Sequence, residues 1–339
     1  MRFNKETIAA CCLLVGVLVL AYVSDGEALP VNYGYTPDPS GAREFAAGLP
    51  SPTFAQAAPD AMEKVKPEDT FLWRAMDSAH RARYGTPFKV SHQGSVGSCV
   101  AHGAAHAIFA SESMAWSLGE RSDPPEWANQ ASIYGGSRVE IRGNKTENRG
   151  GDGSTGYHAA KWLSEYGVIY QRPYPSVDCT DASPSRCKDW GRYGNGGKGN
   201  TELDETAKKT PARYVTRISN WDELVAAICT GNAVTIASNQ GFSKTAKDSW
   251  LRPSGVWMHQ MMICGIKVTD RQGACIMNSW GENWIKYDGE IYPPDLPKGC
   301  FWADRSVIER ILSQGDSWAI SEIAFKFRDI HHNNWLEEQ

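Results

Sequence analysis

One short segment of this chain, residues 93–101, places a glutamine and a cysteine where both could take part in nucleophilic catalysis. Cys99 follows Gly97 and opens a small-residue stretch that predicts a helix. Because the N-terminus of a helix carries partial positive charge, it favours thiolate over thiol, so Cys99 is a candidate nucleophile. The Gln93 side-chain amide and the Cys99 backbone N–H could converge on one point and stabilise a developing oxyanion.

A candidate base lies about 160 residues downstream, in a region that predicts a β-hairpin. His259 begins the apolar run 259–266, and Asn278 directly follows a second apolar run, 274–277. Each run is typical of a buried strand, and the polar residues 270–273 predict the turn between them. The hairpin would bring His259 and Asn278 side by side.

This arrangement assigns a role to each side chain of the hairpin. Asn278 is expected to accept a ring N–H of His259 and so fix the useful tautomer. Trp280 is expected to cover that hydrogen bond and exclude water from it. We also expect the pKa of the Cys99 thiol to lie well below its ordinary value of about 8.5, because His259⁺ and the helix N-terminus both favour thiolate.

The order and surroundings of these residues resemble those of the papain-like cysteine peptidases. The sequence Asn-Ser-Trp-Gly that begins at Asn278 is similar to the family's usual sequence around its asparagine. The resemblance covers roughly residues 88–300. It implies an oxyanion-hole glutamine, a nucleophile, a base and an orienting asparagine at Gln93, Cys99, His259 and Asn278 respectively.

The resemblance also implies a substrate cleft. The glycine-rich segment that contains Gly150 and Gly151 is similar to the family segment whose backbone pairs with an extended peptide. Such pairing is β-strand addition, and bare glycine lets the peptide approach closely. Gly150, Gly151 and Trp280 are therefore the expected substrate-binding residues.

Periodicity and capping residues predict an α+β protein, with helices early in the chain and strands later. The resemblance implies a papain-like two-lobed fold with the active-site cleft between a helical lobe, about residues 99–205, and a β-rich, barrel-like lobe, about residues 206–300. The predicted helices cover 70–84, 99–118, 157–166, 221–229 and 304–312, and the main predicted strands cover 233–237, 256–268 and 274–277.

The N-terminal residues predict targeting rather than fold. Residues 1–28 hold two cationic residues, an apolar run over 8–23 and small residues, which is typical of a signal peptide. An uncleaved membrane anchor over 8–23 is the alternative. We therefore expect a secreted, periplasmic or lumenal protein, or one tethered to a membrane. Residues 29–69 predict a linker or a short pro-segment with no core of its own, and residues 70–339 the peptidase domain.

Composition excludes several partners. The net charge of the 339-residue chain is only −4, and its acidic and basic residues are dispersed, so we expect neither nucleic acid nor an anionic surface as a partner. Cys179 and Cys187 are the best candidates for a disulfide, whereas Cys264 and Cys275 lie in predicted strands and are expected to be free thiols. Paired C-x-x-C spacing does not occur in the sequence, so no metal or other cofactor is expected.

The sequence thus predicts a cysteine-type peptidase that hydrolyses peptide bonds through a Cys-His-Asn triad and a thioester acyl-enzyme. Its expected partner is a peptide or protein substrate. One alternative is an acyl transferase or peptide ligase on the same scaffold, in which an amine replaces water. Another is a non-enzymatic peptide-binding module, although such a module has no need of the thiol.

Overall fold

The computed structural model describes residues 31–143, 152–198, 200 and 202–330. The predicted signal peptide or anchor, residues 1–28, lies outside the described residues. Within the described ranges, no helix combines the length and apolar character that crossing a membrane would require.

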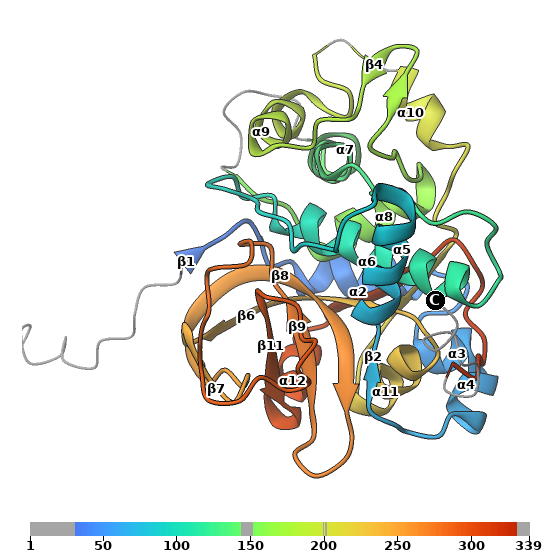
Figure 1. Ribbon diagram of the computed structural model, residues 1–339. Coiled ribbons are helices and arrows are strands. Elements are labelled where there is room, and N and C mark those ends of the chain that lie inside the picture. The colour runs from blue at the N-terminus through green and yellow to red at the C-terminus, as the bar shows by residue number, and fades with distance from the viewer. Residues whose placement is uncertain (1–30, 144–151, 199, 201, 331–339) are drawn as a thin grey trace, which may run out of the picture.

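The molecule has a mainly helical region and a region built on a large sheet, and helix α12 (Arg305–Leu312) lies beside that sheet (Figure 1). The helical region is built around the long helix α6 (Cys99–Ser117), which is buried along nearly its whole length. Two later helices contact α6, namely α7 (Gln130–Gly135), which continues as the π-helix η1 (Gly136–Ile141), and α8 (Gly156–Glu165). Helix α9 (Pro184–Tyr193) packs on α7, and α10 (Glu202–Ala207) follows it in the chain. The short strands β3 (Pro173–Tyr174) and β4 (Val177–Asp178) pair with each other in this region.

The second region is an antiparallel sheet whose strands pair in the order β11, β9, β8, β6, β12, β5. These strands are β5 (Tyr214–Arg217), β6 (Val234–Phe242), β8 (Pro253–Lys267), β9 (Gly273–Met277), β11 (Cys300–Asp304) and β12 (Asp316–Ser321). Two short strands, β1 (Val31–Asn32) and β2 (Thr70–Phe71), also pair with β8. A small ladder of β7 (Thr245–Lys247) and β10 (Lys286–Asp288) lies beside the sheet.

The sheet differs from the expected barrel-like lobe because it does not close. Its path ends at β11 and β5, and among the described residues these two strands do not pair with each other. The β-rich region also extends beyond the expected limit near residue 300, since β12 lies between β5 and β6. The local sequence of β12 does not indicate which strands it pairs with, because β5 and β6 are distant in the chain.

Local sequence explains the elements that carry the site. Helix α11 (Trp221–Cys229) begins as predicted after Asn220, whose side chain accepts from the Glu223 backbone N–H. The predicted hairpin is confirmed as β8 and β9, with Met262 opposite Met277. Helix α12 (Arg305–Leu312) is confirmed, whereas α5 (Trp73–Tyr84) begins three residues later than predicted, because residues 70–71 form β2.

Residues 31–69 are folded, so the expectation of a linker is wrong for this part of the chain. They contain β1 and the helices α2 (Pro39–Gly48), α3 (Phe54–Ala57) and α4 (Pro59–Lys64). Asp38 caps α2 and accepts the Tyr157 hydroxyl of α8 at 2.8 Å. Phe54 is 0% exposed, and Glu223 of α11 accepts the Ala55 backbone N–H. These helices are too short for the apolar periodicity that would reveal them in the sequence.

The expected disulfide is absent from the described residues. All seven cysteines there are free thiols, including Cys179 and Cys187. The Cys179 sulfur is directed at the Val177 carbonyl and the Cys187 sulfur at the Ala182 carbonyl, so the two point to different parts of the loop. Cys264 and Cys275 are free, as predicted.

Candidate active site

Cys99 lies at the first position of α6 and is 0% exposed. Just before it, the Gly97 backbone N–H donates to the Asp152 carboxylate. A side chain at position 97 would bring its Cβ to 2.9 Å from the Asp152 carboxyl carbon and 3.0 Å from the Cα of Gly34. Glycine is therefore required before the cysteine because two other chain segments approach it closely.

His259 and Asn278 are brought together by the β8–β9 hairpin. The Nε2 atom of His259 lies 2.7 Å from the Oδ1 atom of Asn278, and both residues are 0% exposed. The Trp280 ring stacks on the imidazole, with 4.9 Å between ring centroids and 28° between the planes. Within the described residues the other ring nitrogen, Nδ1, is buried without a hydrogen-bond partner. That nitrogen is free to exchange a proton with a reacting group.

The start of α6 packs against β8 at the position of the histidine. The Cys99 sulfur accepts the backbone N–H of Gln260, the residue that follows His259. The Gln260 side chain in turn donates to the Val100 carbonyl at 3.1 Å. The structure thus places the thiol beside the strand that carries the imidazole.

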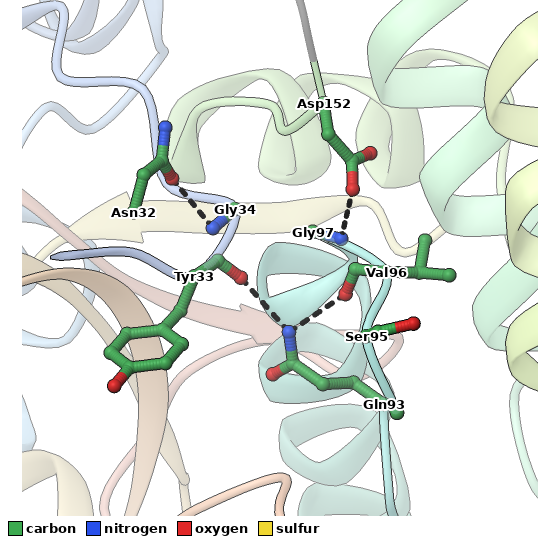
Figure 2. Close-up of a pocket in the computed structure, with 9 residues that line it drawn as sticks. Asn32, Tyr33, Gly34, Gln93, Ser95, Val96, Gly97 and Asp152 are labelled. Carbon is green, nitrogen blue, oxygen red and sulfur yellow. Dashed lines mark hydrogen bonds between the residues drawn. The ribbon is translucent and has the colours of Figure 1, made fainter.

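Gln93 is held so that its amide N–H groups point into the cleft. Its Oε1 accepts the Ser279 hydroxyl at 2.7 Å, and its backbone N–H donates to the Ser279 carbonyl at 2.8 Å. Its Nε2 donates to the Val96 carbonyl and to the Tyr33 carbonyl, each at 2.9 Å (Figure 2). Gln93 therefore presents a fixed donor to a peptide carbonyl of the N-terminal segment.

Residues 31–36, which we call the strap, run through the cleft between the helical region and β8. On one side β1 pairs parallel with β8, and the Tyr33 backbone N–H donates to the Met258 carbonyl at 2.9 Å. On the other side the Ser154 backbone N–H donates to the Gly34 carbonyl, and the Thr36 N–H donates to the Ser154 carbonyl, each at 2.8 Å. The strap is bound by backbone groups on both walls.

The strap lies so close to the start of α6 that it needs a glycine there. Gly34 has a φ of +121°, and a Cβ added to it would lie 2.2 Å from the Gly97 carbonyl oxygen. Figure 2 shows Gly34 beside Gly97, and the Asp152 carboxylate directed at the Gly97 backbone N–H. Residues of the strap and of the segment 93–97, together with Asp152, line a pocket of about 340 Å³.

Two tyrosines fasten the strap. The Tyr33 ring contacts the aromatic rings around the histidine, with centroid distances of 4.6 Å to Trp280 and 5.5 Å to His259. Tyr35 is 2% exposed, and its hydroxyl donates to the buried Asp316 carboxyl at the start of β12. The Tyr33 ring of the strap therefore covers the His259 imidazole together with Trp280.

The expected substrate-binding glycines, Gly150 and Gly151, lie outside the described residues. The residues that follow them in the chain, 152–154, form part of the described cleft wall. Ser154 makes the backbone pairs with the strap, and a Cβ on Gly153 would lie 2.6 Å from the Gly34 carbonyl oxygen. The third expected residue, Trp280, contacts the histidine and the strap.

Burial reverses the expected ionisation of the site. Removal from water raises the pKa of the Cys99 thiol to about 12, against weaker opposing donation by the Gln260 and Val100 N–H groups. Burial likewise lowers the pKa of His259 to about 4, despite the hydrogen bond to Asn278. The prediction of a low thiol pKa is therefore wrong for this strapped structure, in which thiol and imidazole are both neutral.

Sequence reasoning did not identify several residues of the site. Ser279 orients Gln93, and its place after Asn278 in the recognised sequence was the available signal. Tyr33, Tyr35 and Ser154 gave no signal, because their contacts join segments 60 or more residues apart.

Comparisons with known proteins bear on the fold. No protein-family model matches the chain, and no curated protein sequence matches it. Among solved structures it is similar to xylellain, a cysteine protease from Xylella fastidiosa, with 20% identity over 86% of this chain and 91% of that one and a TM-score of 0.50. Digestive procathepsin L 3 from the Tenebrio molitor larval midgut gives 16% identity, coverage of 83% and 79%, and a TM-score of 0.47. The similarity to xylellain shows that the chain has the papain-like α+β fold.

Proposed function

We propose that this protein is a cysteine peptidase that hydrolyses peptide bonds, with Cys99 as nucleophile, His259 as base and acid, Asn278 as the orienting residue and Gln93 as an oxyanion donor. The observation that carries the proposal is the position of Tyr33. Its carbonyl oxygen accepts from the Gln93 side chain while its N–H donates to Met258. A stretch of polypeptide thus already occupies the place where a peptide substrate would react.

In the proposed reaction a substrate peptide replaces the strap. The Cys99 thiolate attacks the carbonyl carbon, and the Gln93 amide and Cys99 backbone N–H stabilise the oxyanion that forms. His259 then gives its Nδ1 proton to the amine nitrogen as the C–N bond breaks. The acyl group remains on Cys99 as a thioester.

Water completes the cycle. His259 takes a proton from the water as its oxygen attacks the thioester carbon, and the C–S bond breaks to release the carboxylic acid. The thiolate and the protonated imidazole are restored. Asn278 holds the imidazole through Nε2 in both steps, which keeps Nδ1 available for proton transfer.

We further propose that the strap is the inhibitory part of a pro-segment and that residues 37–69 belong to the mature enzyme. The strap is bound by backbone hydrogen bonds on both walls and by two tyrosine side chains, whereas α2, α3 and α4 are helices that pack against α8 and α11. Its parallel pairing with β8 blocks the thiol with polypeptide. Activation then requires a cut or displacement near residue 36. We also propose export, on the sequence of residues 1–28.

The test is labelling of Cys99 by a peptidyl fluoromethyl ketone. In Gly34→Ala the new Cβ would clash with the Gly97 backbone, so the strap should be expelled and labelling should become fast. Gly48→Ala is the matched control, because a Cβ there meets nothing within 4 Å and α2 should stay folded. Cys99→Ala in the Gly34→Ala background should abolish both labelling and cleavage of a peptide library.

The two parts of the proposal fail in different ways. If Gly34→Ala and a chain that begins at residue 37 are folded and neither labels at Cys99, the peptidase assignment is wrong. If the unaltered full chain labels as fast as Gly34→Ala, the site is a peptidase site but the strap does not inhibit it.

A further inference from the structure

Three buried thiols converge on one face of the sheet, in the interior of the protein. Cys264 of β8, Cys275 of β9 and Cys300 of β11 are each 0% exposed, and their sulfur atoms all lie within 4.8 Å of one another. The Cys264 and Cys275 sulfurs are 3.7 Å apart. These three residues, which we call the sulfur cluster, take no part in the proposed peptide hydrolysis.

Sheet register explains how three strands deliver these thiols to one point. The pairing of β8 with β9 shifts between Ile263 and Gly265, so Cys264 is an extra residue opposite Cys275. Cys300 lies opposite Met277, two residues along β9 from Cys275, and therefore on the same face as Cys275. The irregularity in β8 thus adds a third sulfur to a pair that the regular ladder already places together.

The same face carries two thioethers. Met277 lies directly opposite both Cys300 and Met262, on its two neighbouring strands. Residues opposite each other in antiparallel strands have their Cβ atoms about 5 Å apart and share a face. The register therefore places three thiols and two thioethers, all of them soft ligands, in one buried patch.

The spacing of the sulfurs fits a metal better than a disulfide. Three sulfurs around one ion at a metal–sulfur distance of about 2.3 Å would lie about 4 Å from one another. A disulfide needs sulfurs about 2.05 Å apart and would leave the third thiol unused. Packing of cysteine as a small hydrophobe does not require the sulfurs to converge.

We propose that the sulfur cluster is a binding site for one thiophilic metal ion, and that this ion is Cu(I). Thiolate and thioether ligands select Cu(I), and Zn(II) would require four ligands, for which the described neighbourhood offers only three thiols. Each thiol that ligates the ion gives up its proton to the solvent while the folding chain is still open to water. Because the site is buried, the ion enters as the chain folds and ties β8, β9 and β11 together.

The test uses the full chain carrying Cys99→Ala, refolded without oxygen in the presence of Cu(I) or of Zn(II). We expect one Cu(I) per chain by elemental analysis, retained against a chromophoric Cu(I) chelator, and a copper X-ray absorption spectrum with only sulfur neighbours near about 2.3 Å. Cys264→Ser, Cys275→Ser and Cys300→Ser should each lose the ion to the chelator. Cys229→Ser is the matched control, since it removes a buried thiol elsewhere and should keep the ion.

The copper X-ray absorption spectrum of the protein with all three cysteines tests the proposal even if the serine variants do not fold. Oxygen or nitrogen neighbours around copper would overturn it. Retention of Zn(II) without retention of Cu(I) would overturn the choice of ion. A Cys264–Cys275 disulfide in the protein as purified, found by mass spectrometry before reduction, or equal Cu(I) retention in all variants, would overturn the site itself.

Discussion

The strap and the helices that follow it are neighbours in the chain but are held by different forces. In residues 31–36 backbone hydrogen bonds run to β8 and to Ser154, Val31 is 46% exposed, and Tyr35 is the one large side chain that is buried. In residues 39–64, Phe54 and Ala61 are fully buried and Asp38 caps α2. Backbone pairing at a cleft can exchange for water or for another peptide, whereas buried apolar side chains cannot leave without loss of stability. A short stretch can therefore lie in the cleft through exchangeable contacts while the next stretch forms part of the fold.

The largest expected effect concerns the thiol itself. In the strapped chain a thiol pKa near 12 leaves roughly one thiolate in 10⁵ at pH 7, so alkylation by iodoacetamide should rise only at high pH. In Gly34→Ala, water and the protonated His259 should lower the thiol pKa below about 8.5. Peptidase activity should then follow a bell, falling in acid as the thiolate is protonated and in base as the imidazole loses its proton. If the rate of Cys99 alkylation depends on pH in the same way in the unaltered chain and in Gly34→Ala, the strap does not control ionisation of the thiol.

Loss of side-chain packing in the helical segment should destabilise the protein without activating it. Phe54→Ala removes a fully buried ring and should lower the free energy of unfolding by about 3–5 kcal/mol. Chemical denaturation measures this directly. Alkylation of Cys99 below the unfolding transition should stay as slow as in the unaltered chain. Fast alkylation of the folded variant would mean that the strap and the helices are released together.

The Gln93 side chain donates to the strap in the unaltered chain and is expected to stabilise the oxyanion during turnover. On the Gly34→Ala background, Gln93→Ala should lower kcat by on the order of 10²–10³, the usual effect of losing one oxyanion donor, with little change in KM. Ser279→Ala should have a smaller effect than Gln93→Ala. It keeps the Gln93 amide but removes the hydroxyl that fixes the orientation of that amide. A large rise in KM with kcat preserved would indicate that Gln93 binds ground-state substrate instead.

The smallest expected effect tests the buried end of the strap. Tyr35→Phe removes the hydroxyl that donates to Asp316 and should weaken strap binding by about 1 kcal/mol, or roughly fivefold in the alkylation rate of the full chain. In a chain that begins at residue 37 the tyrosine is absent, and that chain sets the upper limit of the rate. If Tyr35→Phe already reaches this limit, a single side chain holds the strap and the backbone pairing contributes little.

Much of the site geometry followed from local patterns. The β8–β9 hairpin was predicted because two apolar runs flank a polar turn, and the hairpin alone brings His259 beside Asn278. Cys99 at the start of α6 followed from the small-residue helical stretch. Trp280 was expected over the hydrogen bond because its place, two residues after Asn278, is local to the hairpin.

Other features could not be predicted because they depend on distant contacts. The strand order of the sheet depends on β12 pairing between β5 and β6. The burial that raises the thiol pKa is likewise set by segments far from Cys99 in the chain. The expected disulfide between Cys179 and Cys187 was suggested by spacing alone, which says nothing about where the two sulfurs point.

The sequence by itself determined which chemical groups exist and which of them are local neighbours: the cysteine at a helix start, the histidine and asparagine of one hairpin, and the cap of α11. Only the tertiary structure decided that Cys99 and His259 are buried and neutral, that Gln93 already holds a peptide carbonyl, and that three thiols meet across β8, β9 and β11. The physical reason is the distance along the chain over which each kind of interaction acts. Periodicity and capping act over a few residues, whereas burial, desolvation and sheet register are set by segments that meet only when the whole chain has folded.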